Sequence, residues 1–222
     1  MHVYLLPGLA TDKRLFSGLR LKGFEVRVLE WPTYRKGEGL PDIAARMAPL
    51  VDADRPHVLA GVSMGGMVAQ ELAALTKPRH VVLISSVTGP QEFPLLLHLG
   101  RGLALYHGIT DGTIRLTRPF RRFFGTRDAE LASLLHRMAM DQGGLQIRRG
   151  ARAILHWQGP RWQGPVTRIH GDADRLLPMR APADHVVRGG THPMVLTRAG
   201  EVDAILGRVL RGIVEGEAEM AS

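Results

Sequence analysis

The sequence predicts an α/β fold in which a minimal, mostly parallel sheet of about six strands is flanked by helices and interrupted by a helical insertion. Two observations lead to this prediction. Short apolar runs alternate with helix-like segments up to Ser86, which is the pattern of parallel βαβ units with right-handed crossovers. The alternation then stops and resumes only at Val166, so we expect the residues between them to form the helical insertion.

Each element follows from its local pattern of apolar residues and turn residues. Strands are expected at His2–Leu6, Phe24–Leu29, His57–Gly61, His80–Ser85, Val166–His170 and Asp184–Arg188. Helices are expected near Lys13–Leu21, Pro41–Val51, Met64–Leu75 and Ala199–Val214. This order assigns residues 1–87 and 159–222 to one α/β core and residues 88–158 to the helical insertion.

The composition indicates one ordinary globular domain. A chain of 222 residues with 45% hydrophobic residues is long enough to bury a sizeable core. It contains no cysteine, which excludes disulfides, thiolate metal sites and a cysteine nucleophile. The first residues lack the features of a signal peptide, and no apolar run approaches the length of a membrane span. We therefore expect a cytoplasmic protein with no membrane partner.

A net charge of +8 raises the question of a nucleic-acid partner. The arginines are scattered along the chain, however, and no helix-turn-helix, zinc-finger or single-strand-binding pattern accompanies them. We interpret the densest basic segment, residues 115–127, as a solvated helical face; the alternative is that its arginines bind an anionic group of the substrate. No nucleic-acid partner is expected.

Ser63 lies in the segment Gly61-Val62-Ser63-Met64-Gly65, between an expected strand and an expected helix. A G-x-S-x-G segment at such a junction is typical of a nucleophile elbow, in which a strained turn pushes the serine hydroxyl out of the sheet edge. The glycines let the strand and the helix approach each other, and the helix N-terminus directs N–H groups at negative charge forming there. The alternative interpretation is a glycine turn in which Ser63 only caps the helix.

A nucleophilic serine needs a base that removes its proton and a third group that orients the base. In sheet enzymes of this kind, the chain order is serine, acid, histidine. The segment IHGDADRLLP, residues 169–178, directly follows an expected strand, and GGTHPMVL, residues 189–196, directly precedes the last expected helix. These two segments supply an acid and a histidine in the required order.

Four features of the chain together resemble the α/β-hydrolase superfamily: the Pro-Gly-Leu loop after the first strand, GVSMGG, IHGDADRLLP and GGTH. The resemblance covers nearly the whole chain. It implies that Ser63 is the nucleophile, that His192 is the base and that Asp174, which matches the family's G-x-x-D-x-x-x-P loop, is the acid. It also implies an oxyanion hole formed by the backbone N–H groups of Leu9 and Met64.

The chain departs from the family pattern at three points, none of which removes a catalytic group. It begins at what would be the family's third strand, the segment between Asp174 and His192 is short, and Pro7-Gly8 replaces the more frequent His-Gly. We expect a minimal core, and we expect the backbone donor of the oxyanion loop to be kept.

Alternatives stay open for the acid and the base. Asp172 could be the acid while Asp174 is only a turn residue, and His192 could be a histidine of a surface loop. His170, at the end of an apolar strand, is expected to be a hydrogen-bonded structural histidine. No metal-ligand spacing and no phosphate-binding loop is present, so no metal or cofactor is expected.

The resulting hypothesis is a cofactor-independent serine hydrolase that cleaves a carboxylic ester, or a thioester or lactone, through an acyl-enzyme on Ser63. Its expected partner is a small-molecule ester. The alternatives on the same scaffold are a lyase, a perhydrolase-like haloperoxidase, a transferase, and a small-molecule binding protein that keeps the hydrolase shell. An intact set of serine, acid and histidine weighs against a pure binding protein.

In this resemblance the insertion is a cap above the nucleophile that sets substrate choice. The insertion carries more apolar residues than a few helices can bury among themselves. Some of these residues should therefore line a pocket for small to medium apolar groups. The candidate substrate-binding residues are Phe120, Phe123, Phe124 and Met138. The alternative is that these residues only pack the cap onto the core.

Overall fold

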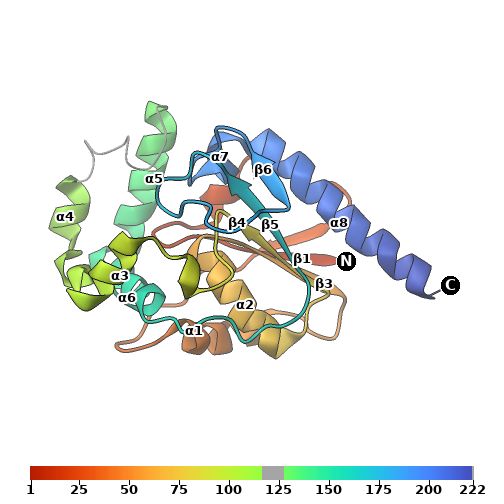
Figure 1. The fold of residues 1–222 in the computed structure, drawn as a ribbon, viewed down its shortest axis with the longest axis horizontal. Coiled ribbons are helices and arrows are strands. Elements are labelled where there is room, and N and C mark those ends of the chain that lie inside the picture. The colour runs from red at the N-terminus through yellow and green to blue at the C-terminus, as the bar shows by residue number, and fades with distance from the viewer. Residues whose placement is uncertain (117–127, 222) are drawn as a thin grey trace.

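A computed structural model describes residues 1–116 and 128–221 of the chain (Figure 1). Its centre is a six-stranded sheet in the order β2-β1-β3-β4-β5-β6, in which every neighbouring pair is parallel. The strands are β1 His2–Leu6, β2 Glu25–Val28, β3 His57–Val62, β4 His80–Ile84, β5 Val166–Gly171 and β6 His185–Val187. The predicted fold class is confirmed, with a fully parallel sheet.

The inner strands β1, β3 and β4 are mostly apolar because helices cover both faces of the sheet. Side chains alternate between the faces along a strand, so Tyr4 and Leu6 belong to one hydrophobic cluster while Val3 and Leu5 belong to the other. All four side chains are buried. The core is therefore divided into two layers, one on each face.

Different helices cover the two faces. α1 Leu40–Met47 and α2 Met64–Thr76 contribute Ile43, Met47 and Leu72 to the cluster that contains Tyr4. α7 Met194–Thr197 and α8 Ala199–Ala221 pack on the opposite face and are joined there by the short 3₁₀ helix η1 Lys13–Phe16. Along the described part of the chain, no helix combines the length and apolar character needed to cross a membrane.

The helix predicted near Lys13–Leu21 is wrong, since only the four residues of η1 are helical. The amide N–H groups of Arg20 and Leu21 donate instead to the Asp203 carboxylate of α8, at 2.6 and 2.9 Å. Leu21 has a left-handed backbone with φ of 39°, which ends any regular helix there. Contacts with α8 thus override the local apolar pattern.

Between β4 and β5 the described residues form helices and loops and contain no strand, as the sequence predicts. The elements are η3 Pro90–Glu92, α3 Leu95–Gly102, η4 Leu105–Gly108, α4 Asp111–Leu116, α5 Ala129–Gln142 and α6 Gly144–Leu155. Figure 1 shows α3 to α6 gathered at the end of the molecule away from the N-terminus. Phe93, Ala153 and Trp157 join the core cluster around α2, so part of this segment packs on the core. Its role as a cap stays a prediction.

Candidate active site

Ser63 occupies the turn between β3 and α2 and has an unusual backbone conformation. Its φ of 54° and ψ of −121° lie in a region that residues with side chains rarely adopt. The turn is held from both sides, because the Ser63 amide donates to the Ile84 carbonyl at 3.0 Å and the Ser86 hydroxyl donates to the Ser63 carbonyl at 2.7 Å. The surrounding backbone therefore maintains a strained turn at the proposed nucleophile.

The glycines around Ser63 are required by close packing. A Cβ atom on Gly61 would overlap the backbone of Gly65, and a Cβ atom on Gly65 would overlap the Leu6 carbonyl of β1. Helix α2 can therefore start directly against the ends of β1 and β3 only if both positions are glycine. This explains the glycine spacing of the sequence motif.

His192 connects Ser63 to Asp174. Its Nε2 atom lies 3.0 Å from Ser63 Oγ, and its Nδ1 atom lies 2.8 Å from Asp174 Oδ2. Since an ionised carboxylate only accepts hydrogen bonds, Nδ1–H donates to Asp174, and Nε2 is left to accept the Ser63 proton. Ser63 follows β3, Asp174 follows β5 and His192 follows β6, so parallel strands bring the three side chains to the same edge of the sheet.

Asp174 is buried and held in one orientation. Its Oδ1 atom accepts the N–H groups of Leu176 and Leu177, both at 2.9 Å, which leaves Oδ2 for His192. Burial by itself raises the pKa of Asp174, but contacts with His170 and His192 and the Leu177 amide outweigh it and hold that pKa well below its usual range. Asp174 is therefore ionised at neutral pH and can stabilise a positive charge on His192.

The other carboxylate of the acid loop faces a different partner. Asp172 is exposed, and its Oδ1 atom accepts the Gly189 amide at 2.6 Å, so the structure pairs His192 with Asp174 rather than with Asp172. His170 is buried, with Nε2 2.8 Å from the Leu177 carbonyl and 3.5 Å from Asp174 Oδ2. It contacts Asp174 and is hydrogen-bonded to the backbone, as expected for a structural histidine.

The two residues predicted to supply the oxyanion donors lie on segments that contact or follow Ser63, and their role stays a prediction. Met64 is the first residue of α2, where an amide has no acceptor within the helix. Leu9 follows Gly8, and a Cβ atom on Gly8 would lie 3.5 Å from Ser63 Cβ. The Leu9 and Met64 amides are thus placed on the two segments that flank the serine.

Helix α6 packs directly on these two residues. A Cβ atom on Gly150 would overlap Leu9 Cδ1 and would lie 3.1 Å from Tyr34 Cε2 and 3.5 Å from Met64 Sδ. The insertion therefore contacts the residues beside Ser63, as a cap would. Among the predicted substrate-binding residues, Met138 is buried on α5, while Phe120, Phe123 and Phe124 lie outside the described residues.

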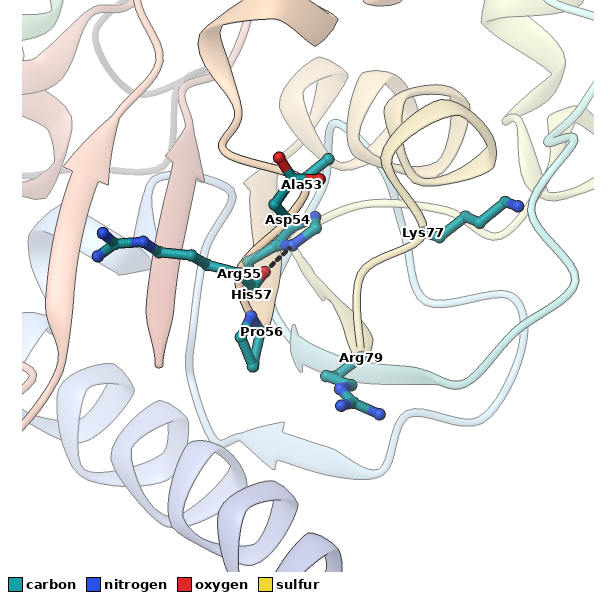
Figure 2. Close-up of a pocket in the computed structure, with 7 residues that line it drawn as sticks. All are labelled: Ala53, Asp54, Arg55, Pro56, His57, Lys77 and Arg79. Carbon is teal, nitrogen blue, oxygen red and sulfur yellow. Dashed lines mark hydrogen bonds between the residues drawn. The ribbon is translucent and has the colours of Figure 1, made fainter.

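A separate pocket of about 200 Å³ lies at the opposite edge of the sheet, by the amino ends of β3 and β4 (Figure 2). Its lining residues are Ala53, Asp54, Arg55, Pro56, His57, Lys77 and Arg79. In Figure 2 the ring of His57 is bound to the Arg55 carbonyl, at 2.9 Å. This pocket has no part in the arrangement around Ser63. Within residues 1–116 and 128–221, histidine, aspartate and glutamate side chains form no group of three placed to hold a metal ion.

Comparison with known proteins identifies the family. The sequence profile of the alpha/beta hydrolase family matches residues 3–205, which is most of the chain. The chain belongs to this family. A search of curated proteins gave no match for this α/β-hydrolase.

Solved structures of similar fold agree with the family. The chain resembles a thermophilic esterase from Thermogutta terrifontis, with a TM-score of 0.75 and 16% identity over 96% of this chain and 90% of that one. It also resembles a putative aryl esterase from Burkholderia cenocepacia, with a TM-score of 0.70 and 16% identity over the same shares. A third structure is the RedJ thioesterase from the prodiginine pathway of Streptomyces coelicolor, with a TM-score of 0.63 and 18% identity over 94% and 89%. At such identities the likeness shows the fold of this α/β-hydrolase.

The sequence patterns did not identify the residues that bind the backbone of the Ser63 turn and of the loop after β1. Ser86 binds the Ser63 carbonyl, and Trp31 donates its indole N–H to the Gly8 carbonyl at 3.1 Å. Both residues come from loops with no motif of their own, so their positions depend on tertiary structure. The contact between His170 and Asp174 could have been found, because the two residues are four apart at the end of a strand.

Proposed function

We propose that this α/β-hydrolase is a cofactor-independent serine hydrolase that cleaves small carboxylic esters, or thioesters or lactones, through an acyl-enzyme on Ser63. The observation that carries the proposal is the position of His192, with one ring nitrogen 3.0 Å from Ser63 Oγ and the other 2.8 Å from buried Asp174. A serine with a base and an orienting carboxylate in line is an activated nucleophile.

In the first half of the reaction, Ser63 is acylated. His192 Nε2 takes the hydroxyl proton while Ser63 Oγ forms a bond to the carbonyl carbon of the ester. The tetrahedral intermediate then breaks its bond to the leaving oxygen, which takes the proton from His192 and departs as an alcohol. Asp174 stabilises the imidazolium that exists between these two proton transfers.

The second half regenerates the serine. A water molecule gives a proton to His192, and its oxygen forms a bond to the acyl carbon. Ser63 Oγ then leaves and recovers the proton, and the carboxylic acid departs. In both halves the amides of Leu9 and Met64 stabilise the oxyanion, a kind of contact whose loss typically lowers the rate by about 10²–10³-fold.

Two further observations support an acyl substrate. Strained backbone conformations such as that of Ser63 cluster at functional sites, which fits a serine presented for reaction. Among the proteins of similar fold, the Thermogutta terrifontis protein is an esterase and RedJ is a thioesterase. An oxygen ester and a thioester are attacked in the same way, so both belong to one proposed class.

The decisive experiment compares wild type with Ser63→Ala on p-nitrophenyl acetate, butyrate and octanoate and on matched thioesters. We expect kcat to fall by about 10⁴-fold or more in Ser63→Ala, since removing the nucleophile disables the whole set of catalytic groups. Ser17→Ala, which changes an exposed serine, serves as the control and should keep wild-type activity. A fluorophosphonate should label Ser63 alone. Label on another serine, or full activity in Ser63→Ala, would refute the proposal.

A further inference from the structure

We propose that Trp31 is a positioning residue for the oxyanion hole, because its indole N–H fixes the peptide group that carries the Leu9 amide. The inference rests on the proposed function, since the Leu9 amide matters only if an oxyanion forms next to Ser63. It concerns a residue outside the motifs that mark the active site.

The Gly8 carbonyl is held by an unusual number of donors. It accepts the Trp31 indole N–H at 3.1 Å, the Thr11 hydroxyl at 2.9 Å and the Thr11 amide at 3.3 Å. A carbonyl oxygen has two lone pairs, so these contacts use its full accepting capacity. The direction of the Gly8 carbonyl is therefore fixed by two separate side chains and one backbone group.

Fixing this carbonyl also fixes the next amide. The Gly8 carbonyl and the Leu9 N–H belong to one planar trans peptide group, in which the C=O and N–H bonds point in opposite directions. Because Trp31 and Thr11 bind the oxygen on one side, the Leu9 N–H is directed to the other side. No contact with the N–H itself is needed, which leaves it available to a substrate oxygen.

The peptide group concerned lies beside the nucleophile. A Cβ atom on Gly8 would be 3.5 Å from Ser63 Cβ and 3.5 Å from the Val62 carbonyl, so Gly8 is in contact with the turn that presents the serine. A 180° rotation of this peptide group would exchange the positions of the Leu9 N–H and the Gly8 carbonyl oxygen. A negative oxygen in that place would repel the developing oxyanion.

Trp31 differs from Thr11 in where it comes from. Thr11 lies three residues beyond Gly8 in the same loop and can move with it, whereas Trp31 belongs to the loop after β2. Its ring packs against the core cluster and makes an edge-to-face contact with Tyr34, with the ring centroids 5.9 Å apart. Trp31 thus ties the oxyanion loop to a second part of the protein.

That second part is itself immobilised by helix α6. The Tyr34 amide donates to Gln146 Oε1 at 2.6 Å, and the Arg149 guanidinium donates to the Tyr34 carbonyl at 2.6 Å. The Trp31 indole therefore packs on the core cluster and on Tyr34, whose backbone is in turn hydrogen-bonded to the insertion. Donors that are fixed before the reaction starts are the ones that stabilise a transition state most.

The test is the variant Trp31→Phe, which keeps an aromatic ring against Tyr34 and removes the N–H donor. We expect kcat on p-nitrophenyl acetate to fall about tenfold with KM within about twofold of wild type, because the lost contact acts in the transition state. The Ki of a trifluoromethyl ketone, which forms a tetrahedral adduct with an oxyanion, should rise by the same factor. Combining the change with Thr11→Val should increase the loss to about 10²-fold, near the value for a missing donor.

The matched control is Trp162→Phe, the same substitution at an indole that donates to the Pro165 carbonyl at 3.3 Å outside the site. It should leave kcat and Ki unchanged, and melting temperatures should show that all variants fold. An unchanged kcat in Trp31→Phe, a change in KM alone, or an equal loss in Trp162→Phe would overturn the inference. If wild type shows no hydrolysis that depends on Ser63, the proposed function and this inference are both wrong. If hydrolysis depends on Ser63 but Trp31→Phe has the kcat and Ki of wild type, only the inference is wrong.

Discussion

Replacing Asp174 with asparagine should abolish most of the activity while leaving the position of the loop intact. The carboxylate Oδ1 accepts the amides of Leu176 and Leu177, and an asparagine oxygen can keep both bonds. The NH₂ group then faces His192 Nδ1, 2.8 Å away in the present structure, and forces that nitrogen to accept a hydrogen bond. The proton of the imidazole moves to Nε2, where it can no longer remove the proton of Ser63.

The expected size of the effect follows from this change of tautomer. In triads of this type, loss of the correct tautomer lowers kcat by about 10⁴-fold, which corresponds to about 5.5 kcal/mol in the activation barrier. We therefore expect Asp174→Asn to reduce kcat for p-nitrophenyl acetate by about 10³–10⁴-fold at pH 7.5. The reduction should come with little change in KM, since the substrate does not contact the acid.

Asp172→Asn is the control within the same loop. Asp172 is exposed and binds the Gly189 amide through an oxygen that asparagine keeps, so kcat should stay within about twofold of wild type. Equal losses in the two variants, or a larger loss in Asp172→Asn, would show that the carboxylate paired with His192 in the structure is not the one that acts.

Asp174 also predicts how stability depends on pH. Its pKa is lowered in the folded protein, so the folded state binds fewer protons than the unfolded chain below about pH 5. The contribution of Asp174 is fully present above the unfolded pKa of about 3.9 and is lost as the pH falls towards the folded pKa. Urea unfolding from pH 7 to pH 2.5 should therefore show a steeper loss in wild type than in Asp174→Asn. Parallel curves would contradict this account of the pKa.

Two further predictions concern a closely packed glycine and a buried carboxylate. Gly150→Ala should lower kcat, because a methyl group there overlaps Leu9 Cδ1 and lies 3.1 Å from Tyr34 Cε2, so the Leu9 side chain must shift beside Ser63. Gly212→Ala on α8, where a methyl group has open space, should leave kcat unchanged. Glu71→Gln should raise the melting temperature at pH 8 more than at pH 4. Burial raises the pKa of Glu71, so the folded protein loses stability as the pH rises above the pKa of this residue in the unfolded chain. Glutamine does not ionise and still accepts the Trp157 indole N–H. A kcat of wild-type size in Gly150→Ala, or a pH-independent effect of Glu71→Gln, would contradict these two accounts.

The parts of the fold that the sequence predicted are those with a short-range signal. Each strand was located within a few residues. The signal is clearest for β3 and β4, which are buried, mostly apolar and end at turn residues. The prediction of a helix at Lys13–Leu21 was wrong. Its apolar residues fit a helix, but Asp203, far away in the chain, binds the backbone of this segment. Boundaries set by distant partners cannot be read from a local pattern.

The candidate site divides in the same way. Ser63, Asp174 and His192 lie in segments with recognisable spacing, and the structure brings their side chains together. Trp31 has no such spacing, since its role depends on two loops meeting after β1 and β2 have paired. Candidate pocket residues were equally hard to choose, because helices with many apolar residues use some of them to pack on the core, as Phe93 does.

The attachment of α6 to the loop after β2 has a consequence for chimeric enzymes. Arg149 and Arg152 of α6 donate to the carbonyls of Tyr34 and Gly37, at 2.6 and 3.1 Å. Replacing the segment between β4 and β5 with that of another family member would remove both arginines, and the carbonyls of Tyr34 and Gly37 would lose these hydrogen bonds. An exchange intended to transfer substrate preference should therefore move residues 31–37 together with the helices, so that the borrowed segment arrives with the loop that fits it.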